Sequence, residues 1–174
     1  MSEKRLIITQ GEQAVSDDPD VVITTLLGSC VSCCLWDPLT QVGGINHMLV
    51  TQLSDTRAVA NDVGVNAMEL LINEILKHGG MRHRLKAKVF GGAQMIEGLP
   101  GIGADNAAFT LDFLSQENME CLSHSIGGTQ ARHLMFWPTT GKVRQRFVRH
   151  AEGEEVLPKM RAAVPPRGND LELF

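Results

Sequence analysis

Residues 24 to 47 read TTLLGSCVSCCLWDPLTQVGGINH, which places a cysteine just after a Gly-Ser turn and a histidine at the end of the next apolar run. A thiol is a poor nucleophile until a base removes its proton, and an imidazole within hydrogen-bond reach supplies that base. Cys30 and His47 are therefore the candidate nucleophile and base of a cysteine hydrolase.

Outward from this stretch, short apolar or β-branched runs are separated by Gly, Asp and Pro, a pattern typical of strands. An expected hairpin turns at Pro138-Thr139-Thr140-Gly141. Apolar residues at helical spacing predict helices over 63–78 and from about 105 to 117, the second capped by Asp105, and a short one near 154–162. The expected strands cover residues 6–9, 21–27, 31–36, 45–51, 86–90, 119–126, 132–137 and 142–148.

The length predicts one domain over residues 1–174, with a core at about 6–150 and a tail at 151–174 that frays at its end. Because the expected strands outnumber the helices, its predicted class is α+β. The apolar runs are far shorter than the ~18 residues of a membrane span, and too few apolar residues follow MSEKR for a signal peptide. The expectation is a cytoplasmic protein without membrane insertion. A net charge of -4 argues against general binding of nucleic acid.

The pair Cys30-Val-Ser-Cys33 also fits a redox dithiol or half of a zinc site. A redox pair normally opens a helix, however, whereas this one enters an apolar strand, and no second pair of zinc ligands is obvious in the sequence. Neither a metal nor a cofactor is expected. Cys33, Cys34 and Cys121 are interpreted as small buried hydrophobic residues.

Three further motifs accompany the Cys30–His47 segment: AKVFGGAQM at 87–95, IGADN at 102–106, and IGG at 126–128 followed by Arg132. Together they resemble the chemoreceptor glutamine deamidase family, CheD, over about residues 6 to 148. The resemblance implies two packed β-sheets with helices along one side, a CheD-like cysteine hydrolase fold. It also implies that Cys30 is the nucleophile, that His47 is its base and that Thr24 completes the site, although the adjacent Thr25 stays open.

The implied activity is that of a protein-glutamine glutaminase. It converts glutamine side chains of a chemotaxis receptor to glutamate through a thioester on Cys30, and the backbone amides of Ser29 and Cys30 are candidate donors to the oxyanion. Family membership also implies a partner of the CheC phosphatase type that competes for the face used by the receptor. The alternative is a non-catalytic chemotaxis adaptor that binds the receptor or the phosphatase.

Two sequence features have an open interpretation. The glycine pairs 43–44 and 91–92 either allow close packing of strands or clear space for a substrate helix. The basic run of Lys142, Arg144, Arg146 and Arg149 is either the solvated face of a strand or a surface for an acidic receptor helix.

Overall fold

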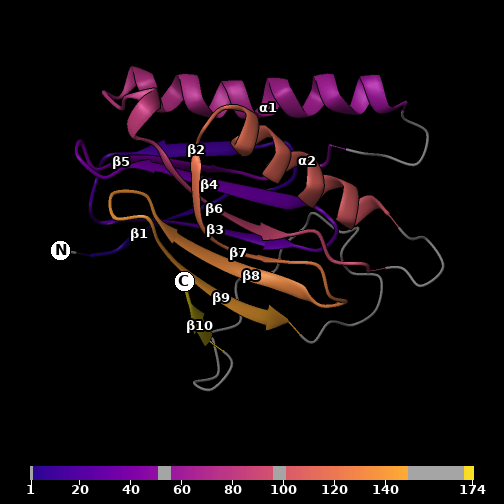
Figure 1. Ribbon diagram of the computed structural model, residues 1–174. Helices are drawn as coiled ribbons and strands as arrows, with labels where there is room; N and C mark the ends of the chain where they lie inside the picture. The colour runs from indigo at the N-terminus through magenta and orange to yellow at the C-terminus, as the bar shows by residue number, and fades with distance from the viewer. Residues whose placement is uncertain (1, 51–55, 96–100, 149–170) are drawn as a thin grey trace.

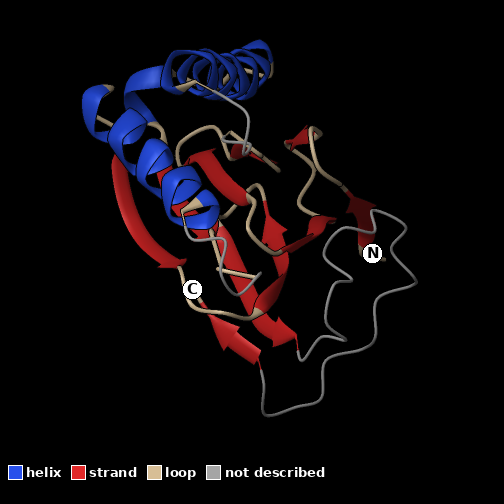
Figure 2. Cartoon of the chain, turned by 90° about the vertical axis from the view of Figure 1, so that its right-hand side faces the viewer, coloured by secondary structure: helices blue, strands red, loops and turns tan. Residues whose placement is uncertain are grey.

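The computed structural model describes residues 2–50, 56–95, 101–148 and 171–174 and arranges them in three layers. Two five-stranded β-sheets lie face to face, and two α-helices cover the outer face of one sheet (Figure 1). Figure 2 shows both helices on the same side of the strands. The expected α+β fold, with two packed sheets and helices along one side, is confirmed.

The turn between β3 (Val21–Leu27) and β4 (Val31–Asp37) connects the two sheets. The first sheet has the order β1-β3-β8-β9-β10, and the second has the order β2-β5-β4-β6-β7; β1 runs parallel to β3 and β6 runs parallel to β7, while the other neighbours are antiparallel. The turn at residues 28–30 therefore carries the chain from one sheet to the other. The strands are β1 (Lys4–Ile7), β2 (Gln13–Ser16), β3 (Val21–Leu27), β4 (Val31–Asp37), β5 (Val42–Asn46), β6 (Lys86–Gly91), β7 (Glu120–Ile126), β8 (Ala131–Trp137), β9 (Lys142–Val148) and β10 (Leu171–Leu173).

Buried apolar side chains fill both interfaces between the layers. Strand β4 serves both of them, because successive side chains of a strand point to opposite faces. Cys34 and Trp36 pack between the sheets, whereas Cys33 and Leu35 pack toward the helices. The core between the sheets also contains Ile8, Val21, Ile23, Leu27, Cys30, Ile45, Phe90, Leu134, Phe136 and Val143.

Helix α1 (Arg57–Lys77) begins six residues before the predicted start at residue 63. Thr56 caps it by accepting a hydrogen bond from the Val59 amide. Most of the added residues are exposed, so the apolar spacing that located the helix is absent there. A short 3-10 helix, η1 (Arg82–Arg84), follows α1 and precedes β6.

Helix α2 (Ile102–Gln116) also begins earlier than predicted, and the prediction of Asp105 as its cap is wrong. Gly101 stands at the cap position, and the Asp105 amide already donates within the helix to the Gly101 carbonyl at 2.7 Å. Asp105 therefore lies in the first turn. There its charge still favours the helix, because the exposed amides of a helix N-terminus attract anions.

Most predicted strands are confirmed within a few residues, and the hairpin of β8 and β9 has the expected turn, with Gly141 at φ +76°. Sequence reasoning missed β2, which is short and only half-buried. It also missed β10, which pairs with β9 where a frayed end was expected. The helix expected near residues 154–162 lies outside the described residues.

The glycine pairs take the close-packing interpretation, and the basic run has the pattern of a partly solvated strand face. A Cβ on Gly43 would lie 2.3 Å from the Pro138 carbonyl oxygen, so close packing requires glycine there. On β9, half-exposed Lys142, Arg144 and Arg146 alternate with more buried neighbours, as expected for a partly solvated face. Arg149 lies outside the described residues.

Candidate active site

The turn that carries Cys30 is held by three hydrogen bonds to its carbonyl groups. The carbonyls of residues 28, 29 and 30 accept, in that order, from the Ala93 amide at 3.0 Å, the side-chain amide of Asn106 at 2.9 Å and the Gly92 amide at 2.8 Å. The partners come from the end of β6 and from α2. This turn is therefore fixed by the sheet and the helix behind it rather than by its own sequence alone.

Glycine is required where β6 ends against this turn. Gly91 and Gly92 have φ values of +109° and +67°, which favour glycine. A Cβ on Gly91 would lie 2.3 Å from the Cys30 carbonyl oxygen, and one on Gly92 would lie 2.7 Å from the Gly103 carbonyl oxygen. The pair lets β6 approach both the nucleophile turn and α2, which favours the close-packing interpretation.

The pairing of Val31 with Met48 brings Cys30 and His47 to one face. These two residues exchange backbone hydrogen bonds of 2.9 and 2.8 Å in an antiparallel bridge. The register then sets Ser32 opposite His47, with Cys30 as the diagonal neighbour of His47 on the same face. Diagonal neighbours lie within reach of long side chains, so the two residues that the sequence singled out share one face as diagonal neighbours of this bridge.

His47 is buried, and its ring is oriented by Thr25. The Thr25 hydroxyl lies 2.8 Å from Nδ1 of His47 and donates its single proton to the Ile8 carbonyl oxygen, also at 2.8 Å. Since that proton is already used, Nδ1 must carry the hydrogen of a neutral ring and donate it to the hydroxyl oxygen. The lone pair of the imidazole is then on Nε2, the nitrogen that can act as a base.

Burial lowers the pKa of His47 to about 4, although the nearby Glu12 carboxylate acts in the opposite direction. The imidazole is therefore neutral at pH 7, and no imidazolium stands beside Cys30 in the resting protein. A neutral imidazole can accept the thiol proton during attack, which is general-base chemistry rather than a preformed ion pair.

Thr24 does not make the contact expected of it. Its hydroxyl lies on the other face of β3, where it donates to the Leu6 carbonyl oxygen at 3.4 Å. The physical reason is the alternation of a strand: Thr25 shares its face with Ile23 and Leu27 in the core between the sheets, and Thr24 does not. The residue that orients His47 is Thr25.

Cys30 and Cys33 lie on opposite faces of the second sheet, Cys30 between the sheets and Cys33 toward the helices. They therefore do not form a dithiol or a pair of zinc ligands. Among the described residues, no group of three or more His, Cys, Asp or Glu side chains is placed to hold a metal ion. Burial raises the pKa of Cys33, Cys34 and Cys121, which makes these thiols unreactive.

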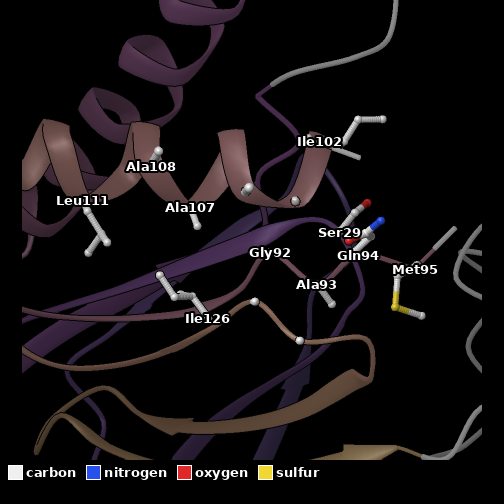
Figure 3. A pocket seen from close by; sticks show the side chains of 15 residues that line it. Ser29, Gly92, Ala93, Gln94, Met95, Ile102, Ala107, Ala108, Leu111 and Ile126 are labelled. Atoms are coloured by element: carbon white, nitrogen blue, oxygen red, sulfur yellow. The ribbon is translucent and has the colours of Figure 1, made fainter. Parts of the chain in front are cut away.

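A largely apolar cavity of about 440 Å³ opens beside Ser29. Figure 3 shows Ala107 and Leu111 of α2 on one side of it and Ile126 at the end of β7 on the other. Most of its other lining residues are Gly or Ala, so the backbone is close to its surface. Its lining includes Ser29 of the nucleophile turn but neither Cys30 nor His47.

Sequence reasoning left Thr25 open as the alternative to Thr24, and it missed two other residues near this site. Asn106 belongs to the IGADN motif, but nothing in that motif shows that its side chain reaches the Cys30 turn. Gln10, whose Oε1 lies 3.9 Å from Sγ of Cys30, stands in a turn between β1 and β2. No local pattern marks it, because its position depends on how three separate segments pack.

A family model described as CheD chemotactic sensory transduction matches residues 48–147, more than half of the chain. This chain belongs to the CheD family. That match begins just after His47, so the assignment of the site rests on the geometry above. Within the parts of the chain that the structure describes, neither α-helix is long and apolar enough to cross a membrane.

Curated CheD relatives are similar along most of the chain. A probable chemoreceptor glutamine deamidase CheD from Caulobacter sp. (strain K31) is 48% identical over 96% of this chain and 91% of that protein. Proteins of the same name from Caulobacter vibrioides (strain NA1000 / CB15N) and Agrobacterium fabrum are 50% and 45% identical. The match covers 81% of this chain and 76% of the relative in the first case, and 98% and 97% in the second.

Among solved structures, the hypothetical protein YfiH of Bacillus licheniformis superposes with a TM-score of 0.44 at 14% identity, over 65% of this chain and 49% of that one. Structural similarity at this level does not indicate a shared function.

Proposed function

We propose that this protein deamidates glutamine side chains of chemotaxis receptors, with Cys30 as the nucleophile and His47 as the general base. Receptor glutamine deamidation is the activity named for its CheD relatives. The observation that carries the residue assignment is the Val31–Met48 bridge, because it sets Cys30 and the neutral imidazole of His47 on one face.

The reaction follows from these groups. Sγ of Cys30 attacks the carboxamide carbon while its proton passes to Nε2 of His47, and the electron pair of the carbonyl bond moves to oxygen. The imidazolium then protonates the amide nitrogen, the C–N bond breaks, and ammonia leaves behind a thioester. Water, deprotonated by the same imidazole, hydrolyses the thioester to glutamate and restores the thiol.

The backbone amides of Ser29 and Cys30 remain the proposed donors to the oxyanion. In a planar trans peptide the N–H points away from the C=O of the same unit. Since the carbonyls of Gly28 and Ser29 point to Ala93 and Asn106, the amides of Ser29 and Cys30 point to the opposite side of the turn. Donors held in place by such a rigid turn stabilise developing charge without reorganising.

The substrate surface and the location of the protein are part of the same proposal. The apolar cavity, which Ser29 of the nucleophile turn lines, is the proposed contact surface for a part of the substrate away from the reacting carboxamide. Competition by a CheC-type phosphatase for this face stays a prediction of the family resemblance, and a cytoplasmic location stays a prediction of the sequence pattern.

The test is incubation of the purified protein with the cytoplasmic domain of a chemoreceptor, followed by peptide mass spectrometry. Each deamidated glutamine gains about one dalton. We expect the gain with wild type and with the control Cys121→Ala, no gain with Cys30→Ala, and a roughly 10²- to 10⁴-fold slower reaction with His47→Ala. Binding of the receptor by wild type without any mass gain would instead identify a non-catalytic adaptor.

A further inference from the structure

Residues 9 to 12 form a tight turn that is stabilised by hydrogen bonds between its own residues. The Glu12 amide donates to the Thr9 carbonyl oxygen at 2.9 Å, and Gly11 has φ +84°, as the third position of a type II turn requires. The Glu12 carboxylate also accepts from the hydroxyl and the amide of Thr9. These bonds hold the pKa of Glu12 below its ordinary value, so the carboxylate that closes the turn stays ionised.

The same turn is bound to the backbone of the catalytic base. The Gly11 amide donates to the His47 carbonyl oxygen at 2.9 Å, and the His47 amide donates to the Glu12 carbonyl oxygen at 3.0 Å. His47 is in turn held by Thr25 and by the neighbouring bridge of Met48 with Val31. The turn therefore has a defined position relative to the base and the nucleophile.

Gln10 occupies the second position of this turn, and its side chain reaches the nucleophile. The Cys30 thiol donates a long hydrogen bond to Gln10 Oε1 at 3.9 Å. The turn itself does not need glutamine at this position, because most residues fit there. The fold thus places the carboxamide of Gln10 next to the reacting sulfur. The turn itself does not require a carboxamide at this position.

We propose that Gln10 is a further catalytic residue, whose side-chain NH₂ donates a hydrogen bond to the oxyanion formed on the substrate. This inference rests on the proposed deamidase function. Gln10 forms and breaks no covalent bond. The sulfur–carbon bond is made by Cys30, the thiol proton goes to His47, and the negative charge that Gln10 meets is on the former carboxamide oxygen.

A carboxamide suits both stages of this reaction. In the resting protein the thiol is a donor, so the acceptor Oε1 faces it. Once the thiol proton has moved to His47, Cys30 is no longer a donor. Negative charge then appears on the substrate oxygen attached to the carbon that Sγ has just bonded. Rotation about the last torsion of glutamine is soft and exchanges the oxygen for the two N–H donors.

The experiment compares Gln10→Ala and Gln10→Glu with wild type and with the control Gln13→Ala. Gln13 is a glutamine three residues further on whose Nε2 donates to the Leu70 carbonyl of α1, away from Cys30. We expect Gln10→Ala and Gln10→Glu, which both lose the N–H donors, to lower kcat for receptor deamidation roughly 10²-fold with little change in KM. Gln13→Ala should keep the wild-type kcat.

Alkylation of Cys30 by iodoacetamide separates oxyanion stabilisation from simple positioning of the thiol. That reaction occurs at a saturated carbon and forms no oxyanion. We therefore expect the alkylation rate of Cys30 in Gln10→Ala to stay within about threefold of wild type while deamidation falls roughly 10²-fold. An equal fall in both rates would overturn the proposal, because Gln10 would then only position the thiol.

Two further results would also overturn it. One is an unchanged kcat in Gln10→Ala when wild type is active, which leaves the deamidase function intact and removes only this inference. The other is a one-dalton gain at Gln10 itself that depends on Cys30, because Gln10 would then be a substrate of the thiol. A wild-type protein that deamidates no receptor would remove the proposed function and this inference together.

Discussion

The hydroxyl of Thr25 determines which nitrogen of His47 can act as a base. It accepts from Nδ1 and donates to the Ile8 carbonyl, so the basic lone pair is restricted to Nε2. The small side chain of Thr25 thus controls the tautomer of His47. Its neighbour Thr24 is equally buried but belongs to the other face of β3.

Substitution of the two threonines tests this directly. Thr25→Ala removes one neutral hydrogen bond to the imidazole, worth about 0.5 to 1.5 kcal/mol, so we expect kcat to fall roughly three- to tenfold. Thr25→Ser keeps the hydroxyl and should stay near wild type, and Thr24→Ala should change kcat less than about twofold. Steady-state deamidation kinetics would contradict the assignment if Thr24→Ala were slow and Thr25→Ala normal.

Helix α2 supplies the link between the two loops of the site. Fully buried Asn106 donates to the Ser29 carbonyl oxygen at 2.9 Å and accepts from the Val50 amide at 3.0 Å. One side chain of α2 thus joins the nucleophile turn to the segment that follows His47. The helix is bound closely enough to do this because Gly92 and Gly103 allow backbone to approach backbone.

Asn106→Ala leaves the Val50 amide and the Ser29 carbonyl without this partner. Each buried polar group that loses its hydrogen bond costs about 1 to 3 kcal/mol, so we expect a lower free energy of unfolding in urea. Since the Cys30 turn is also released, kcat should fall at a temperature where the variant is fully folded.

Thr110→Val is the matched control, because Thr110 is equally buried one turn further along α2 and its hydroxyl donates to the Asn106 carbonyl oxygen within the helix. It should lose some stability with an unchanged kcat. If Asn106→Ala lost stability alone, α2 would be a purely structural support.

Buried His47 and half-buried His133 make the stability of the whole molecule depend on pH. Burial lowers the pKa of His47 to about 4, and burial together with Arg146 and Arg5 lowers that of His133 to about 4. In the unfolded chain both return to about 6.5. Between these values the unfolded chain binds more protons, so acid stabilises it and the free energy of unfolding falls.

We therefore expect stability to decrease as pH falls from about 6.5 to about 4, with each histidine contributing on the order of 3 kcal/mol. Urea unfolding at several pH values between 7.5 and 4.5 measures this. His133→Gln should show about half the decrease. An equal decrease in wild type and His133→Gln would contradict the role of His133.

Asp37 affects the stability in a different pH range from the two histidines. Burial alone would raise its pKa, but hydrogen bonds from Arg84 and from the amides of Met81, Leu39 and Thr40 outweigh it and hold the pKa well below the usual range. A depressed carboxyl pKa contributes stability that is lost only on acidification below about pH 4. The decrease in stability between pH 6.5 and 4 can therefore be distinguished from the loss that protonation of Asp37 causes.

The α+β class, most strands, all but the first turns of both helices and the pair of Cys30 and His47 were predictable because they depend on local patterns and on one contiguous stretch. Strand propensity, glycine punctuation and motif spacing are properties of neighbouring residues. They do not depend on which sheet a strand joins.

Tertiary structure decided the residues around that pair. β3 is buried on both faces, so its sequence shows no alternation that distinguishes Thr24 from Thr25. Gln10 reaches Cys30 from 20 positions away, and Asn106 reaches the neighbouring Ser29 from 77 positions away. These contacts form only when the β1–β2 turn and α2 pack around the turn between the two sheets. Local propensity contains no information about such contacts, because their energy exists only after the layers have assembled.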